Sequence, residues 1–131
     1  MTSSTSVSQE IDLNAPPARV YQALTVSKEH AAFTGATSEI DASEGGAFRC
    51  HDAQIVGWNL ELVEDARIVQ AWRVAAWPAG VFSVVKYELT ANDVGGTHVS
   101  LSHTGLPEGA NAMIADGWEQ RYWKPLAAYL A

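Results

Sequence analysis

The chain has 131 residues, 47% of them hydrophobic, with a net charge of −7 and a single cysteine. This length predicts one domain, and the hydrophobic fraction is enough for a substantial core. Acidic residues outnumber lysine and arginine by fifteen to eight, with no basic run, which excludes nucleic acid and anionic membranes as expected partners. The lone Cys50 excludes an internal disulfide and a cysteine-based zinc site.

The N-terminal segment is rich in serine and threonine and lacks the apolar stretch of a secretory signal. We expect residues 1–5 to form a frayed, disordered tail and residues 6–131 to form the single domain. The sequence contains no run approaching the ~18 apolar residues that cross a bilayer. These observations favour a cytoplasmic protein without membrane insertion.

Weak alternation over residues 7–13 predicts a first strand. Asn14 is suited to cap a short helix whose first turn holds two prolines and which ends near Thr25. Ser27 is suited to cap a second short helix, and Gly35 suits its C-terminal stop. The chain is therefore expected to begin with a strand and two short helices.

After residue 37 the hydrophobic period changes from 3.6 to 2, which is typical of strands. We predict six further strands, at residues 38–42, 48–52, 55–63, 67–75, 81–90 and 97–104. Because the links between them are short, the seven strands are expected to pair antiparallel and to curl. On the inner face of the strand 55–63 we expect Val56, Trp58, Leu60 and Leu62.

Residues 111–130 carry the longest helical pattern in the sequence, an apolar stripe of period 3.6. The stripe consists of Ile114, Trp118, Tyr122, Pro125 and Tyr129. Burial of each large side chain contributes about 1.5–3 kcal/mol, so the helix must pack on a broad surface, which the strands provide. Pro125 removes one helical hydrogen bond and should kink the helix. The expected fold class is α+β, with a curved antiparallel sheet around a long C-terminal helix.

Short stretches along nearly the whole domain resemble a known superfamily. They are residues 15–24, 44–49, 62–64, 71–73, 87–90, 96–97, 101–106 and 117–118. The resemblance is to the START-related, birch-pollen-allergen-like helix-grip superfamily (SRPBCC), and within it to the family named for the C-terminal domain of the activator of the heat-shock-protein 90 ATPase. It implies a helix-grip fold with a seven-stranded sheet and two short helices after the first strand. It leaves the function open, because this superfamily includes lipid carriers, hormone sensors, cyclases and co-chaperone modules.

Two features depart from the family pattern. Members often carry a tryptophan pair after the second short helix, where this chain has Ala32-Phe33-Thr34-Gly35, so that wall of a cavity is expected to be smaller or more open. We also expect a stand-alone domain without the chaperone-binding N-terminal part of the true activator. Such a domain need not contact the chaperone.

A helix gripped by a curved sheet is expected to leave an apolar pocket of about 300–1,000 Å³ for a small molecule. The expected lining residues are Trp58, Trp72, Tyr87, Leu101 and His103 from the strands, and Ile114, Trp118 and Tyr122 from the helix. The alternative is that these side chains simply fill the core.

His103 is the polar residue of most interest because it shares a face with Val99 and Leu101, which should point inward. Three roles stay open for it. It is a structural histidine bonded to a tyrosine or to the backbone, an anchor for a ligand, or a general acid–base group.

The remaining histidines, His30, His51 and His98, show no metal-ligand spacing, so neither a metal nor a cofactor is expected. Cys50 alternates with Phe48 and is expected to be a small core residue.

Arg73 and Arg121 each adjoin an aromatic residue of the expected lining. Near a cavity, such an arginine would pair with Glu61 or hold a ligand carboxylate bidentately. The alternative is a surface guanidinium stacked on an aromatic ring.

Three functions follow from these observations. The first is a domain that binds a small hydrophobic or amphipathic ligand. The second is a chaperone-linked, stress-response interaction module that uses an exposed patch near Phe33 or the Trp77-Pro78 loop. The third, which we favour least, is a cyclase or hydrolase that uses His103 with a tyrosine. The sequence leaves open whether the protein is a monomer or a homodimer.

Overall fold

The computed structural model describes residues 5–131, and the first four residues of the expected tail lie outside the described residues. Thr5 belongs to the described chain, and its backbone carbonyl accepts a hydrogen bond from the Leu106 amide at 3.0 Å.

The described chain forms a seven-stranded antiparallel sheet, two short helices and a long C-terminal helical segment. The elements are β1 (Val7–Leu13), α1 (Pro17–Thr25), α2 (Ser27–Thr34), β2 (Glu39–Ile40), β3 (Ala47–Cys50), β4 (Ile55–Val63), β5 (Arg67–Val74), β6 (Ser83–Ala91), β7 (Thr97–Thr104), α3 (Asn111–Gly117), η1 (Trp118–Trp123) and α4 (Lys124–Leu130). The predicted α+β architecture is confirmed.

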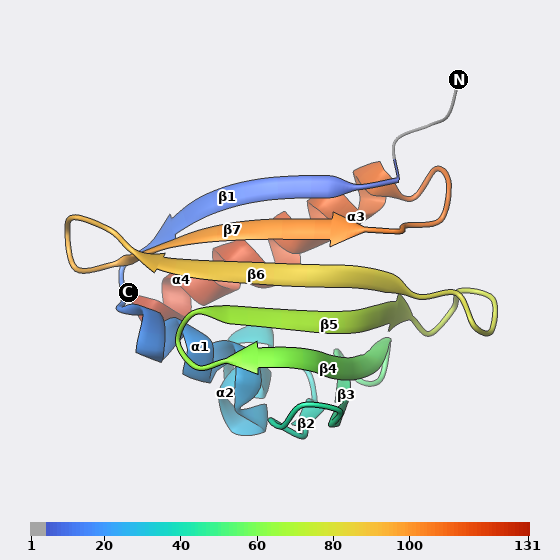
Figure 1. Cartoon of the computed structure of the whole chain (residues 1–131), viewed down its shortest axis with the longest axis horizontal. Coiled ribbons are helices and arrows are strands. Elements are labelled where there is room, and N and C mark those ends of the chain that lie inside the picture. The colour runs from blue at the N-terminus through green and yellow to red at the C-terminus, as the bar shows by residue number, and fades with distance from the viewer. Residues whose placement is uncertain (1–4) are drawn as a thin grey trace.

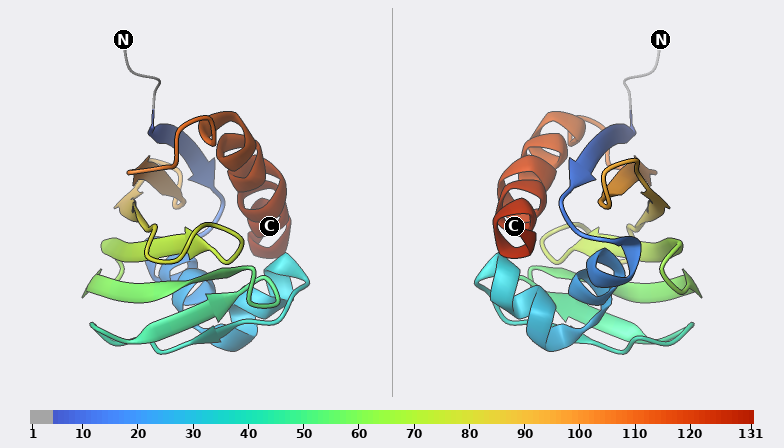
Figure 2. Two further views of the ribbon diagram at one scale, coloured as in Figure 1. Left: turned by 90° about the vertical axis from the view of Figure 1, so that its right-hand side faces the viewer. Right: turned by 90° about the vertical axis from the view of Figure 1, so that its left-hand side faces the viewer.

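The strand order is β1-β7-β6-β5-β4-β3-β2, so the first and last strands pair with each other. The two short helices carry the chain from β1 to the opposite edge of the sheet (Figure 1). The C-terminal helical segment runs across the concave side of the curved sheet (Figure 2). This arrangement leaves the other face of the sheet uncovered by helices.

The two short helices begin differently from the prediction. The residue that precedes α1 as its N-cap is Pro16, and that of α2 is Val26, so the expected caps Asn14 and Ser27 are wrong. The Ser27 hydroxyl is used elsewhere, because it accepts a hydrogen bond from the Ile40 amide at 2.8 Å and so fixes the short strand β2. Gly35 ends α2 with a φ of 75°, as predicted.

The inner and outer faces of β4 are the reverse of the prediction up to a β-bulge between Asn59 and Glu61, after which Leu62 packs against the core as predicted. Gly57 and Asn59 are buried, whereas Trp58 is 47% exposed on the outer face. Only glycine fits at this inner position, because a Cβ on Gly57 would lie 1.8 Å from the Ala71 carbonyl oxygen and would crowd the Phe48 ring. A polar side chain is tolerated at Asn59 because its side-chain nitrogen donates one hydrogen bond and its side-chain oxygen accepts another within the protein.

The C-terminal segment contains a π-helical turn, η1, which ends two residues before Pro125. In this turn the Lys124 amide bonds to the Glu119 carbonyl, five residues back. The wider turn adds one residue to the inner face, so both Tyr122 and Trp123 are buried. The buried stripe then continues through Leu126 and Leu130, and the predicted stripe members Pro125 and Tyr129 are only half-buried.

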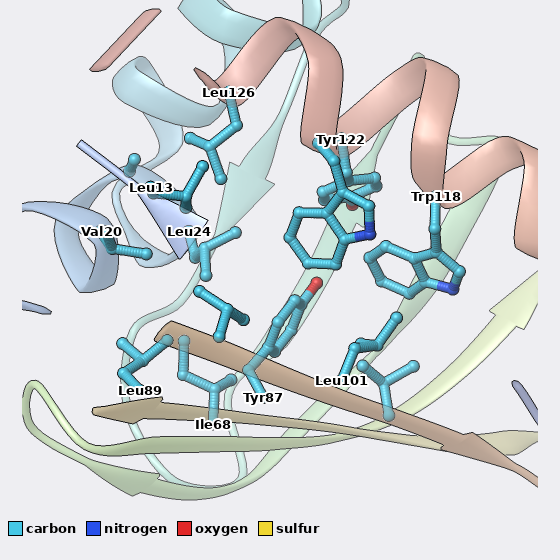
Figure 3. Close-up of a cluster of buried hydrophobic side chains, with 14 of the residues drawn as sticks. Leu13, Val20, Leu24, Ile68, Tyr87, Leu89, Leu101, Trp118, Tyr122 and Leu126 are labelled. Carbon is cyan, nitrogen blue, oxygen red and sulfur yellow. The ribbon is translucent and has the colours of Figure 1, made fainter. Parts of the chain in front are cut away.

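The core lies between this helical segment and the strands β5, β6 and β7 (Figure 3). Tyr87 rises from the sheet toward Trp118 and Tyr122, and Leu126 extends the same buried cluster further along the helical segment (Figure 3). The inward faces predicted for β5, β6 and β7 are confirmed, because Trp72, Tyr87, Leu101 and His103 are all buried.

Candidate functional site

A pocket with a volume of about 340 Å³ lies between the first half of the C-terminal helical segment, the β3–β4 turn and the end of β5. Its lining consists of His51, Gln54, Ile55, Trp72, Val74, Met113, Ile114, Asp116, Gly117, Trp118, Gln120, Arg121 and Tyr122. The volume is within the range of small-molecule sites.

The pocket lies beside α3, where the side chains pack less deeply on the sheet than those from Trp118 onward. The side chains of α3 are half-buried or exposed, whereas Trp118 is 2% exposed. Gly117 keeps the wall open, because a Cβ at this position would meet no described atom within 4 Å.

A chain of hydrogen bonds fixes the deep side of the pocket. The Ser83 hydroxyl donates to the Trp72 carbonyl oxygen at 2.9 Å and lies 2.7 Å from Nε2 of His103. Since the hydroxyl proton is already used, Nε2–H of His103 must donate to Ser83, which leaves Nδ1 as an acceptor. The Trp118 indole N–H donates to that Nδ1 at 3.0 Å.

His103 is neutral, with its hydrogen on Nε2. Burial lowers its pKa from 6.5 to about 4, and both ring nitrogens are engaged by the protein. The ring also contacts Trp72 at a centroid distance of 4.6 Å, and Trp72 stacks on Trp118 at 6.0 Å. His103 is therefore a structural histidine, with Ser83 and Trp118 as its partners instead of the expected tyrosine or backbone group.

Two further histidines, His30 and His51, contact Tyr122, which lines the pocket. His30 lies 2.7 Å from the Ser38 hydroxyl through Nδ1 and 3.2 Å from the Tyr122 hydroxyl through Nε2. Burial, followed by the nearby His51, lowers the pKa of His30 to about 3. The ring of His51 contacts Tyr122 at a centroid distance of 5.2 Å.

His51 differs from the other buried histidines because Nε2 has no hydrogen-bond partner among residues 5–131. The residue is 7% exposed, and burial, followed by the charge of Arg121, lowers its pKa. A buried polar group without a partner costs about 1–3 kcal/mol. His51 also has a φ of 53°, in the left-handed region that few non-glycine residues adopt.

Four of the eight residues expected to line a pocket do so: Trp72, Ile114, Trp118 and Tyr122. Three others, Tyr87, Leu101 and His103, are buried in the core outside this lining. Trp58 lies on the opposite face of the sheet, because the face prediction for β4 was wrong.

The two arginines have different environments. Arg73 donates hydrogen bonds to the carbonyl oxygens of Val81, Trp77 and Pro78 and lies over the Phe82 ring, so it holds the β5–β6 loop in place.

Arg121 is exposed at the pocket, and its side chain makes no hydrogen bond or ion pair with any residue in the described part of the chain. Of the alternatives left open for the two arginines, pairing with Glu61 is wrong, because that carboxylate binds Arg67 at 2.7 Å.

Sequence reasoning missed His51, Gln54 and Gly117 as parts of the pocket wall. The predicted strand 48–52 continues past Cys50, and alternation with the inward Cys50 would turn His51 outward. Instead His51, Asp52 and Ala53 all have positive φ, which turns the imidazole inward. The presence of His and Asp, which tolerate the left-handed region, was the available signal.

Other chemistry is limited in the described residues. Cys50 is buried and burial raises the pKa of its thiol to about 11, which agrees with the expected core role. Within residues 5–131 there is no cluster of three or more His, Cys, Asp or Glu side chains that could hold a metal, and no helix long and apolar enough to cross a membrane. The cytoplasmic location expected from the sequence stays a prediction.

Exposed apolar side chains gather on the outer face of the sheet, away from the expected positions. Phe33 is 6% exposed, so the patch predicted around it is wrong, and Trp77 is half-buried against Trp72. The outer-face patch, as we call it, consists of Trp58, Phe82 and Val84, which are 37–47% exposed. Trp58 and Val84 lie in one cross-strand row, and the rings of Trp58 and Phe82 are 5.5 Å apart.

The sheet, the gripping helix and the two short helices define a helix-grip domain. Residues 14–131 match the family described as Activator of Hsp90 ATPase homolog 1-like protein, and the chain belongs to this family.

Individual relatives agree with this assignment. Human Activator of 90 kDa heat shock protein ATPase homolog 1 is 30% identical over 109 residues, which cover 82% of this chain and 32% of the human protein. The chain thus spans about a third of the length of that relative.

Solved structures share the fold. PFC0360w, an HSP90 activator from Plasmodium falciparum, superposes with a TM-score of 0.91 at 22% identity and covers 96% of both chains. The Aha1 dimer from Colwellia psychrerythraea superposes with a TM-score of 0.79 at 16% identity and covers 95% of both chains.

Proposed function

We propose that this domain binds a small amphipathic molecule in the pocket between its C-terminal helical segment and the β3–β4 turn. The observation that carries the proposal is a volume of about 340 Å³ with aromatic walls and polar groups at its edge. Ligand sites typically combine a mostly apolar lining with a few polar groups that orient the ligand.

The size of the pocket limits the ligand. A water molecule occupies about 30 Å³ in the liquid, so the pocket has room for roughly ten non-hydrogen atoms. Trp72 and Trp118 offer flat aromatic surfaces to an apolar ligand body. Gln54 from the β3–β4 turn, and Gln120 and Arg121 from the helical segment, supply polar groups to the lining.

The variant that tests the proposal must change the pocket without damaging the core. Trp118→Ala would cost about 3–5 kcal/mol, because Trp118 is a large buried side chain, and a loss of binding would then be hard to separate from unfolding. Gly117→Leu is better suited, because the new side chain enters open space on an ordinary helical backbone with a φ of −59°.

The experiment is isothermal titration of the wild-type protein with 3-phenylpropan-1-ol, a neutral amphipathic probe that fits the pocket. We expect saturable binding to the wild type and at least a tenfold weaker affinity in Gly117→Leu. Ala128→Leu, which adds the same side chain at an exposed position of α4, is the matched control and should bind like the wild type. Binding that survives Gly117→Leu, or an absence of binding to the wild type by this and related probes, would remove the proposal.

A second function is supported by the family relationship. The relatives of this chain include the human Activator of 90 kDa heat shock protein ATPase homolog 1, at 30% identity. We propose, as the alternative, that the domain is a chaperone-linked module that contacts an Hsp90-type ATPase through the outer-face patch. Exposed contiguous apolar surface is typical of protein contacts.

This alternative predicts that the chain stimulates the ATPase of its cognate Hsp90-type chaperone. Trp58→Glu should reduce the stimulation, because it places a charge in the middle of the outer-face patch. Gly117→Leu should have no effect on it. If the wild-type protein neither forms a complex with the chaperone nor stimulates its ATPase, this alternative ends. The ligand proposal would stay in place.

The enzyme hypothesis has lost its main candidate residue. His103 is 0% exposed, and both ring nitrogens are hydrogen-bonded within the protein. A general acid–base group needs a nitrogen that reaches the substrate. We therefore make no proposal of catalysis.

A further inference from the structure

We propose that the pocket selects a ligand that carries a carboxylate, with the anionic group held between Arg121 and Nε2 of His51 and the apolar body placed against Trp72 and Trp118. This inference rests on the proposed ligand-binding function and adds the chemical class of the ligand.

The first observation is the unsatisfied nitrogen of His51. Its imidazole lines the pocket, is 7% exposed, and has Nε2 buried without a hydrogen-bond partner in the part of the chain that the structure describes. Buried polar groups in native proteins are nearly always paired, so an unpaired one at a pocket wall indicates a partner supplied from outside the chain.

The second observation is the backbone that presents this nitrogen. His51, Asp52 and Ala53 all adopt positive φ values of 53°, 57° and 67°. The Asp52 carboxylate stabilises the turn by accepting hydrogen bonds from the Thr37 amide and hydroxyl, both at 2.9 Å. Strained backbone that is held in place by its surroundings is concentrated at functional sites.

The third observation is the position of Arg121. It lines the same pocket, close enough that its charge lowers the pKa of His51, and within residues 5–131 no carboxylate forms an ion pair with it. A guanidinium group binds carboxylates bidentately through two parallel N–H groups. In the neutral His51 tautomer that carries its hydrogen on Nε2, the two side chains together offer a cationic group and an N–H donor to one anion.

Asp116 is the group that opposes this assignment, because its carboxylate also lines the pocket. If Asp116 dominates the electrostatics, the pocket selects a cationic ligand instead. The choice of probes must separate these two outcomes.

The experiment compares three probes that share a phenylpropyl body: 3-phenylpropanoate, 3-phenylpropan-1-ol and 3-phenylpropylamine. Affinities are measured by isothermal titration at pH 7.5 and low salt. We expect the carboxylate to bind at least tenfold more tightly than the alcohol, and the amine to bind most weakly.

Variants assign the preference to the two side chains. Arg121→Gln should abolish the preference for the carboxylate while binding of the alcohol is retained. Arg49→Gln, the same change at an exposed position on the outward side of β3, is the control and should keep the preference. His51→Asn, which tolerates the left-handed backbone, should reduce the preference severalfold.

Equal affinity for the carboxylate and the alcohol, a preference for the amine, or a preference that survives Arg121→Gln would each overturn this inference. In all three cases the alcohol still binds, so the proposed function stands. If none of the probes binds, the proposed function itself fails.

Discussion

The indole N–H of Trp118 donates to Nδ1 of His103 across 3.0 Å, and this bond joins the C-terminal helical segment to the last strand of the sheet. Both side chains are buried, at 2% and 0% exposure. The hydrogen bond thus specifies where the helix sits on the sheet, and with it the deep wall of the pocket.

Trp118→Phe should lower the free energy of unfolding by about 1–3 kcal/mol, because it leaves Nδ1 of His103 buried without a donor. Urea denaturation measures the change. Trp58→Phe makes the same substitution on the exposed outer face and should change stability by less than about 0.5 kcal/mol. Equal effects of the two substitutions would show that the bond to His103 is not important.

Stability should fall as the pH is lowered from about 6.5. The pKa of His103 is lowered to about 4 and that of His30 to about 3, mainly by burial. Below pH 6.5 the unfolded chain therefore binds protons that the folded chain does not bind, so the stabilisation is fully present above pH 6.5 and is lost toward pH 3–4. For His103 alone, a fall in pKa from 6.5 to about 4 corresponds to roughly 3 kcal/mol.

Urea denaturation between pH 7 and pH 5 isolates the effect of these histidines. The lowered pKa values of Asp52 and Glu61 reduce stability only at more acidic pH, around and below their ordinary values of 3.8 and 4.5. The exposed His98 acts in the opposite direction, because Glu10 and Asp12 raise its pKa. A free energy of unfolding that is constant or rises from pH 7 to pH 5 would contradict the assignment of neutral, buried histidines.

Two glycines should respond in opposite directions to replacement by alanine. Gly117→Ala should raise stability by about 0.8–1 kcal/mol, because the residue is helical and a Cβ there meets open space. Gly57→Ala should be strongly destabilising, because the Cβ would lie 1.8 Å from the Ala71 carbonyl oxygen. Melting temperatures of the two variants test this, and a destabilised Gly117→Ala would indicate that no open space adjoins this helical position.

The sequence predicted the architecture well because the strand pattern and the long apolar helix are repeated over many residues. It failed at β4, where a glycine and a hydrogen-bonded asparagine occupy the inner face and a tryptophan lies outside. Hydrophobic alternation assigns the large apolar side chain to the core and does not detect that Gly57 is required beneath the Phe48 ring. The error placed Trp58 in the expected pocket.

The candidate site was predicted only in part for a similar reason. The helical period identified Ile114, Trp118 and Tyr122, which do line the pocket. The π-helical turn and the left-handed turn at His51 each break a regular period, so Trp123 and His51 were not assigned to their inward positions. Irregular backbone of this kind depends on tertiary contacts and leaves little trace in a hydrophobic pattern.

The most direct test of the ligand-binding proposal is a titration of isotope-labelled protein with 3-phenylpropanoate, followed by amide chemical shifts. The proposal predicts saturable shifts at His51, Gln54, Gly117 and Arg121, the residues of the pocket wall, and their loss in Gly117→Leu. Shifts that do not saturate, or that cluster on the outer face around Trp58 and persist in Gly117→Leu, would contradict it.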